Sequence, residues 1–275
     1  MGADVSAADN GYVLFLSWPD FYNDIRTTTA EASDDYEVEN LINQEPGMPW
    51  RSDSAVAQTI LGDFGALQDV NAFLLWKHNL QSIAGATIRL RLFTVAVQDL
   101  SVTYAGNHTL NGWSETLGSP RKFCAGDFTV ENSDNWDLLI TDTANPDGYI
   151  EAGKLMLGNM WKPILQFNWG VSIGWQDPTQ YATYDDQSIG AIEALAPYRV
   201  GTISWEYLTQ AEAELFNTYC VNAGKRRTIF INPYPTDTSE YARSLRFLAR
   251  LESWTPPLKI KGSRWAVSIS FRETL

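Results

Sequence analysis

Alternation of apolar and polar residues is the clearest pattern along the chain. It runs over residues 87–92 and again over 265–271. Successive side chains of a strand point to opposite faces, so each stretch predicts a strand with one buried face. Shorter apolar runs predict further strands at 11–17, 136–140 and 149–158.

The second half of the chain predicts one helix between two strands, at 200–205 and 227–232. Thr209 is followed three residues later by Glu212, which is the spacing of a capping box and starts a helix over 210–223. Gly224 suits the turn that ends it. The residues expected on its buried face are Ala211, Leu215, Phe216 and Tyr219.

Turn residues mark the loops. Gly-Asn, Asn-Gly and Gly-Ser-Pro steps make residues 105–122 a loop-rich stretch, and Asn-Pro-Asp-Gly at 145–148 predicts a turn. Residues 242–254 fit either a strand or a helix, and the strand is preferred.

Charge divides the chain near residue 160. Residues 1–160 hold 22 acidic and eight basic side chains, whereas residues 161–275 hold 11 and 12. A surface that binds a nucleic-acid backbone needs clustered Lys and Arg, so the front part is not expected to bind nucleic acid. The chain has only two cysteines, too few for a disulfide framework, and no apolar run is long enough to insert in a membrane.

Several blocks in the first half resemble the discoidin or galactose-binding-like family of β-sandwiches. They are Glu39–Ile42, Trp50–Ser52, Gln58–Gly65, Val70–Leu75, His78–Asn79 and Ala86–Leu92. The resemblance implies a jelly-roll domain that binds ligands with the loops at its ends. The stretch Tyr149–Gly158 also resembles the closing strand of such sandwiches.

The order of elements in the second half resembles the minor tail and distal tail (baseplate) proteins of long-tailed bacteriophages. A strand, the helix 210–223, a strand with Phe230, a Pro-containing stretch and a last strand ending at Glu273 carry this resemblance. It implies a β-sandwich with one flanking helix that assembles into a ring. The expected fold class is therefore mainly β: a galactose-binding-like jelly-roll sandwich plus a tail-type β-sandwich domain.

Three segments are expected from these patterns. Residues 1–26 form an N-terminal strand and lead-in that could pair with the C-terminal domain, 27–160 the jelly roll, and 161–275 the tail-ring-type domain. If the first strand belongs to the last domain, the jelly roll is an insertion within it.

Glycan contact is the site hypothesis that the jelly-roll resemblance favours. Sugar-binding modules stack aromatic rings on sugar faces and bind hydroxyls with Arg, Asn and His. The candidate residues are Trp50, Arg51, His78, Asn79, Asn107, His108 and Trp113. The alternatives are that Trp50 packs in the core and that His78 and Asn79 close a turn.

Signals for catalysis or metal binding are weak. Gly170-Val171-Ser172-Ile173-Gly174 spells a hydrolase nucleophile elbow, but no helix start follows and both histidines precede the serine, so a strand is preferred. His108 and Cys124 are too few for a zinc site. Asp34, Asp35 and Glu37 could hold calcium but are better explained as a solvated acidic loop. No catalytic residue, metal or cofactor is therefore predicted.

The function expected from the sequence is structural, without enzymatic activity. The chain would build a phage tail tip or baseplate as a trimeric or hexameric ring, assembled in the host cytoplasm and carried in the virion. Its jelly roll would contact other tail proteins or host surface glycans. The first alternative is a stand-alone, lectin-like carbohydrate-binding module, and the second is a glycan-cleaving tail enzyme.

Overall fold

A computed structural model describes residues 12–14, 25–27, 34–42, 48–80, 86–93, 103–109, 123–164, 172–183, 189–193, 196–234 and 245–274. The chain forms two compact units: residues 16–160, and residues 1–15 together with 161–275. The predicted fold class is confirmed, because the chain is mainly β, with a jelly-roll sandwich and a second β-rich unit that carries one helix.

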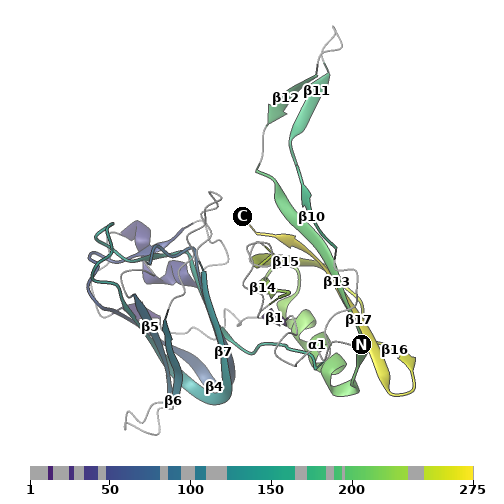
Figure 1. Cartoon of the computed structure of the whole chain (residues 1–275), viewed down its shortest axis with the longest axis horizontal. Helices are drawn as coiled ribbons and strands as arrows, with labels where there is room; N and C mark the ends of the chain where they lie inside the picture. Colours follow the sequence, from purple (N-terminus) through teal and green to yellow (C-terminus); the bar gives the residue numbers. More distant parts are fainter. Residues whose placement is uncertain are drawn as a thin grey trace, which may run out of the picture. The chain divides into compact units, whose positions relative to one another are not determined.

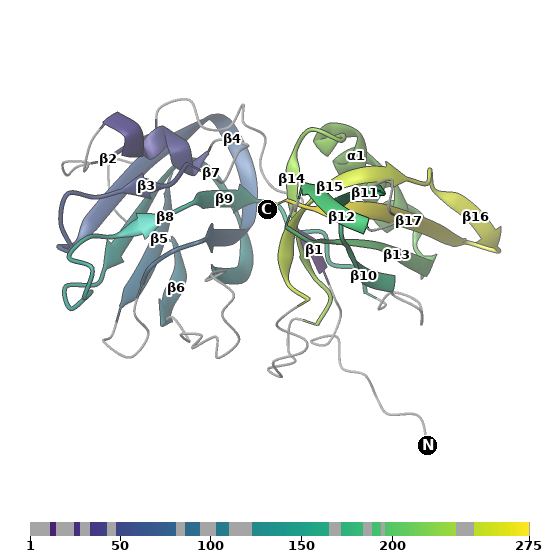
Figure 2. The same cartoon turned by 90° about the horizontal axis from the view of Figure 1, so that it is seen from above.

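The unit of residues 16–160, called the jelly-roll unit here, is built on a six-stranded sheet (Figure 1). In sheet order the strands are β2 (Arg26–Thr27), β4 (Gln58–Trp76), β7 (Phe123–Thr141), β5 (Thr87–Phe93) and β6 (Thr103–Thr109), with β9 (Lys154–Gly158) pairing with part of β4. All these pairs are antiparallel. Two short strands, β3 (Trp50–Arg51) and β8 (Glu151–Ala152), form a separate pair, and two 3-10 helices, η3 (Asp34–Tyr36) and η4 (Val38–Leu41), precede them (Figure 2).

The alternating pattern of β5 determines which side of the sheet becomes the core. Ile88, Leu90 and Leu92 are buried, while the residues between them are exposed or half-buried, as the sequence predicts. They join a core that also contains Trp50, Phe73 and Trp136, all fully buried. Burying an aromatic or branched apolar side chain contributes about 1.5–3 kcal/mol, so this core is the main source of stability in the unit.

Residues 1–15 and 161–275, called the helix-bearing unit, are built on a seven-stranded sheet with all pairs antiparallel. In sheet order the strands are β1 (Tyr12–Leu14), β14 (Thr228–Asn232), β15 (Phe247–Trp254), β17 (Arg264–Glu273), β13 (Tyr198–Leu208) and β10 (Ser172–Gln176), with β16 (Leu258–Lys261) pairing with β17. The strands expected at 200–205, 227–232 and 265–271 are present, and the ambiguous stretch 242–254 contains a strand.

The first described strand of the chain lies at one edge of this sheet. Tyr12, Val13 and Leu14 of β1 pair with Asn232, Ile231 and Phe230 of β14. In the sequence, the jelly-roll unit therefore lies between β1 and the other strands of the helix-bearing unit.

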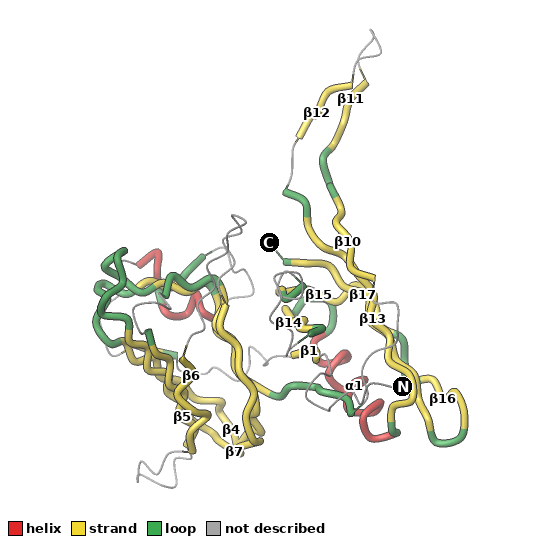
Figure 3. The backbone as a smooth tube through the Cα atoms, viewed as in Figure 1, coloured by secondary structure: helices red, strands yellow, loops and turns green. Residues whose placement is uncertain are grey.

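Beyond the ends of β10 and β13 the backbone continues as a two-stranded arm (Figure 3). Its strands are β11 (Gln180–Thr183) and β12 (Ile189–Glu193), which pair with each other and with no other described strand. Ser172, the serine of the sequence that matches a hydrolase nucleophile elbow, lies in strand β10. The prediction of a strand at this position is therefore confirmed.

Two details of the predicted elements are wrong. β6 occupies residues 103–109 and so overlaps the stretch 105–122 that was expected to be loop-rich, because Ala105 and Asn107 pair with β5 and Gly106 lies at an irregularity of the register instead of turning the chain. The single closing strand expected at 149–158 is divided into β8 and β9, since the Gly153 N–H bonds to the Trp76 carbonyl between them.

The helix α1 (Gln210–Ala223) begins at the predicted capping box. The Glu212 N–H donates to the Thr209 hydroxyl at 3.2 Å, and the Thr209 N–H donates to the Glu212 carboxylate at 2.8 Å. The predicted buried face is confirmed for Phe216 and wrong for Ala211 and Leu215, which are exposed. The buried residues are Ala213, Phe216, Cys220 and Ala223. Three of these four residues are small, which lets the helix approach the sheet closely. The prediction favoured larger apolar residues for the buried face and therefore missed the small ones.

Three aromatic rings join this helix to the sheet. Trp161 packs edge-on against Trp205 of β13 with ring centroids 4.9 Å apart, and Phe216 of α1 lies 4.9 Å from Trp161 and 5.8 Å from Trp205. The Trp161 indole N–H also donates to the Glu212 carbonyl at 3.2 Å. The cluster therefore holds the start of α1, β13 and the segment that begins at Trp161.

The Glu212 side chain contributes a pH-dependent part of this stability. Burial alone would raise its pKa, but hydrogen bonds from the Ile164 N–H and from Thr209 outweigh burial and lower the pKa. A carboxyl group whose pKa is lower in the folded than in the unfolded state stabilises the fold at any pH above its unfolded-state pKa. This stabilisation is lost as the pH falls through the folded-state pKa.

Replacing Thr209 with alanine is expected to lower the free energy of unfolding by about 1 kcal/mol, because the helix loses its cap. Urea denaturation at neutral pH measures the loss. Thr218→Ala on the same helix is the matched control: its exposed hydroxyl bonds only to the Glu214 carbonyl one turn back, so it should cost nothing measurable. Equal losses for the two variants would contradict a special role for the cap.

No helix among the described residues is long and apolar enough to cross a membrane.

Candidate functional site

The residues that the sequence suggested as glycan contacts differ in how deeply the structure buries them. Trp50 is fully buried in the jelly-roll core, so its ring offers no face to a sugar, and the packing alternative describes it correctly. His78 is also buried, with 8 % of its surface exposed. Asn107 and His108 lie on β6, opposite Arg89 and Ile88, but their side chains are outside the described residues, as is all of Trp113.

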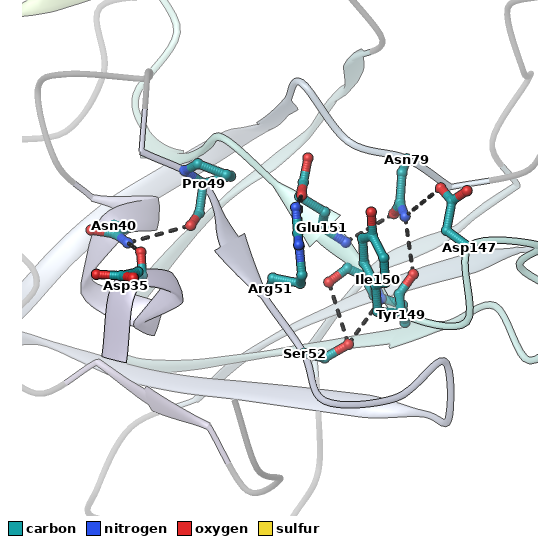
Figure 4. A network of polar contacts seen from close by, with 10 residues as sticks. All are labelled: Asp35, Asn40, Pro49, Arg51, Ser52, Asn79, Asp147, Tyr149, Ile150 and Glu151. Atoms are coloured by element: carbon teal, nitrogen blue, oxygen red, sulfur yellow. Dashed lines mark hydrogen bonds and ion pairs between the residues drawn. The ribbon is translucent and has the colours of Figure 1, made fainter. Parts of the chain in front are cut away.

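Asn79 holds neighbouring backbone segments in place. Its amide nitrogen donates to the Asp147 carboxylate at 3.1 Å and to the Tyr149 carbonyl at 3.0 Å, while its amide oxygen accepts from the Glu151 N–H at 2.8 Å (Figure 4). These bonds fix the segment 147–151 next to the end of β4. Asn79 therefore positions the residues around it.

A turn before Tyr149 sets the direction of that segment. The Gly148 N–H donates to the Asn145 carbonyl at 3.1 Å, and the Asp147 N–H donates to the Asn145 side-chain oxygen at 3.0 Å. Gly148 has φ 76°, a left-handed conformation that glycine adopts at low cost. The turn predicted at 145–148 is therefore present, and it delivers Tyr149 and Glu151 to one side of the strand.

Arg51 is the centre of the candidate site. It lies opposite Glu151 in the β3–β8 pair, and its Nε and Nη2 donate to Glu151 Oε2 at 2.9 and 2.5 Å. The guanidinium carbon lies 4.1 Å from the ring centre of Tyr36 and 4.4 Å from that of Tyr149. Arg51 of β3 thus joins one aromatic ring from η3 with a second ring and a carboxylate from the segment 149–151.

Ser52 ties the same strands together beneath this cluster. The Ile150 N–H donates to the Ser52 hydroxyl at 2.9 Å, and the Ser52 N–H donates to the Ile150 carbonyl at 2.9 Å (Figure 4). Ser52 and Ile150 are fully buried, whereas their neighbours Arg51 and Glu151 are half-buried. The cluster therefore stands on a rigid base with its polar groups directed toward the surface.

Several polar groups of the cluster have no protein partner among the described residues. They are Arg51 Nη1, Glu151 Oε1 and the hydroxyl groups of Tyr36 and Tyr149. The Arg51 and Glu151 side chains keep 27 % and 25 % of their surface exposed. A donor, an acceptor and two hydroxyl groups that can act as either are thus presented together beside two aromatic rings.

The charge of Arg51 is secure at any physiological pH. Partial burial alone would lower its pKa, but the hydrogen bond and negative charge of Glu151, with smaller contributions from Tyr149 and Tyr36, raise the pKa above its usual value. Its free Nη1 is therefore a permanent charge-assisted donor.

Tyr36, Tyr149 and Glu151 were missed as site residues in the sequence. A signal for two of them was present, because Tyr149 and Glu151 alternate with the apolar Ile150 and Ala152 and so share the solvent side of one strand. Tyr36 had no such signal, since only the fold brings η3 beside β3. Of the sequence candidates, Arg51 is in this cluster and Asn79 supports it.

Metal ligands do not gather here: no group of three or more His, Cys, Asp or Glu side chains suited to a metal ion occurs in the described ranges. The acidic residues considered as a calcium site in the sequence include Asp34, whose side chain lies outside the described residues.

No family model matches this sequence, and a search of curated proteins found no match. Solved structures are similar in fold. A chitosan-binding module from a chitosanase/glucanase of Paenibacillus sp. IK-5 is 14 % identical, with a TM-score of 0.41 over 51 % of this chain and 97 % of that one.

Two further structures come from Clostridium perfringens. A CBM32 module of a family 31 glycoside hydrolase is 16 % identical, with a TM-score of 0.41 over 53 % of this chain and 95 % of that one. A family 32 module solved with galactose is 12 % identical, with a TM-score of 0.37 over 49 % and 91 %.

Proposed function

We propose that the jelly-roll unit is a carbohydrate-binding module whose site is the cluster of Tyr36, Arg51, Tyr149 and Glu151. The observation that carries this proposal is the set of unpaired donors and acceptors beside two half-exposed tyrosine rings. A saccharide presents hydroxyl groups around an apolar ring face, and tyrosine offers an apolar ring with a polar end. The chemistry of the cluster therefore suits a sugar.

The cluster is suited to binding and has no equipment for cleaving a glycosidic bond. Retaining and inverting glycosidases use a pair of carboxylic acids that flank the bond. Here the one carboxylate at the centre, Glu151, is engaged by Arg51 at 2.5 Å. The proposed role is accordingly recognition, without chemistry on the glycan.

The test is a glycan array probed with the full chain, followed by calorimetric titration of the best ligand. Arg51→Lys is expected to weaken binding at least tenfold, because lysine keeps the charge but loses the planar group between the rings. Tyr36→Phe and Tyr149→Phe each remove one hydroxyl group and are expected to weaken binding about two- to tenfold.

Arg91→Lys is the matched control, because Arg91 also pairs with a carboxylate of the jelly-roll unit, that of Asp137, at 2.6 Å. It should bind the glycan as tightly as the unaltered chain. Unchanged affinity in Arg51→Lys would place the site elsewhere, and an array without any ligand would refute the proposed function.

A second candidate function is a structural role in the tail of a bacteriophage. It is favoured by the sequence position of the jelly-roll unit, between β1 and the remaining strands of the helix-bearing unit. On this proposal the helix-bearing unit assembles into a trimeric or hexameric ring in the virion, and the inserted jelly roll contacts host glycans or other tail proteins. Native mass spectrometry tests it: a closed ring supports this role, and a chain that never exceeds a dimer argues against it.

A further inference from the structure

The strand β10 (Ser172–Gln176) lies at an edge of the sheet in the helix-bearing unit. It pairs along one side with β13, and no strand in the described part of the chain pairs with its other side. An edge strand of this kind presents a row of backbone N–H and C=O groups that another strand can use.

The edge lacks the features that normally prevent such pairing. Its sequence, Ser-Ile-Gly-Trp-Gln, contains no charged residue and no proline, and its register with β13 runs without a bulge. Natural edge strands are usually protected by lysines, prolines or bulges.

An exposed tryptophan marks this edge. Trp175 is 66 % exposed. It pairs in register with Arg199, whose side chain is buried and lies over the Trp175 ring at 5.4 Å. Trp175 lies on the same face of the sheet as Ile203 and Trp205 of β13, which are buried. The apolar face of the sheet therefore extends past these buried residues to the exposed Trp175. A tryptophan fixed in this way is typical of residues that dominate protein interfaces.

The five residues of β10 are complementary to themselves. If two copies pair antiparallel about Gly174, each Ile173 lies opposite the Trp175 of the other copy, and each Ser172 lies opposite Gln176. An aromatic residue opposite a β-branched one is a favourable cross-strand pair, and the symmetry supplies it twice. No charge is brought against a like charge.

We infer that two copies of this chain associate through their β10 strands, in the antiparallel register that places Gly174 opposite Gly174. Such a contact is two-fold and closed, in contrast to the head-to-tail contacts of a ring. It joins the two sheets edge to edge and gives each assembly two jelly-roll units. If those units bind glycans, a surface with many copies of the ligand would be held more tightly than one free saccharide.

Disulfide trapping tests the register. Gly174→Cys is well suited, because a side chain at Gly174 meets no atom within 4 Å. In the inferred register the two new cysteines face each other across the axis at a distance a disulfide can span, so mild oxidation should give covalent dimer. Ser172→Cys is the matched control: its two copies would lie roughly 13 Å apart and should not cross-link.

The unaltered chain, treated in the same way, measures the background from the native cysteines, Cys124 and Cys220. Cys220 is buried, and burial raises the pKa of its thiol, so it reacts slowly. Cross-linking of Ser172→Cys as strong as that of Gly174→Cys would overturn the inferred register.

A charge-swap experiment tests the association itself. Gly174→Lys and Gly174→Glu each place like charges across the axis and should raise the dimer dissociation constant about fivefold or more in sedimentation equilibrium. An equimolar mixture of the two variants should restore the association. Trp175→Ala should weaken it at least tenfold.

Three results would overturn the inference. They are a chain that remains monomeric at all concentrations, an assembly insensitive to both Gly174 variants, and a ring of three or six copies in which β10 pairs with β1 of the next copy.

Discussion

Replacing Arg199 with methionine is expected to lower the free energy of unfolding by about 3–5 kcal/mol, because the buried Glu273 carboxylate would lose the guanidinium that balances its charge. Glu273 has only 1 % of its side chain exposed, and Arg199 has 6 %. The guanidinium donates to both carboxylate oxygens, at 3.1 and 2.7 Å, and the Arg199 N–H adds a third bond at 2.9 Å. A carboxylate that has lost the guanidinium would have little access to water at this position.

The surroundings of Arg199 add to the expected loss. Its guanidinium lies 4.2 Å from the ring centre of Phe247, which packs against Phe271 with ring centroids 5.7 Å apart. The long side chain therefore fills space in the core as well as pairing a charge. Because Arg199 is in β13 and Glu273 ends β17, the damage should be centred on these two strands. Hydrogen exchange of their amides in the full chain measures it locally.

The double variant Arg199→Met, Glu273→Leu separates charge burial from packing. Replacing both partners of a buried ion pair with apolar residues of similar size is often neutral or stabilising, so the double variant should recover most of the lost stability. The exposed pair Arg272–Glu252 provides the matched control: its atoms are 3.9 Å apart and its side chains are 56 % and 51 % exposed. Arg272→Met should cost less than about 1 kcal/mol. A similar cost for Arg199→Met and Arg272→Met would refute the argument.

Local patterns in the sequence were sufficient to predict individual elements. The alternation at 265–271 corresponds to β17, and the Thr209–Glu212 spacing marks the first turn of α1. These elements could be predicted because their signals depend on residues close together in the chain. The buried face of α1 could not, because the sheet that covers it selects Ala213 and Cys220 over the larger Leu215.

The candidate site depended on contacts between distant segments. Arg51 and Glu151 are 100 residues apart and meet only through the β3–β8 register. The sequence identified Trp50 and Arg51 together as sugar contacts, but alternation along a strand sends their side chains in opposite directions. Trp50 points into the core and Arg51 toward the surface. Once β3 is known to be a strand, only one of the pair can face a ligand.

Adding one methyl group at Gly62, by the substitution Gly62→Ala, is expected to destabilise the jelly-roll unit by about 3 kcal/mol. Gly62 of β4 lies opposite Trp136 of β7, and the indole ring covers it. A Cβ atom at residue 62 would lie 2.4 Å from Trp136 Cζ2 and 2.6 Å from Cε2, far inside contact distance. Trp136 is fully buried, so its ring can move away only by disturbing the core. Overpacking of this kind costs about 1–3 kcal/mol, and occasionally more.

Two comparisons make the Gly62 prediction specific. Gly174→Ala is the control, since its Cβ would meet no atom within 4 Å and should leave the jelly-roll unit unchanged. Trp136→Phe combined with Gly62→Ala should cost less than the sum of the two single changes, because the smaller ring makes room for the methyl group. In a glycan titration, Gly62→Ala should reduce the fraction of folded, binding-competent molecules and leave their affinity unchanged, because Gly62 is not one of the residues of the Arg51 cluster. Strict additivity of the two substitutions would show that the clash with Trp136 is not the cause.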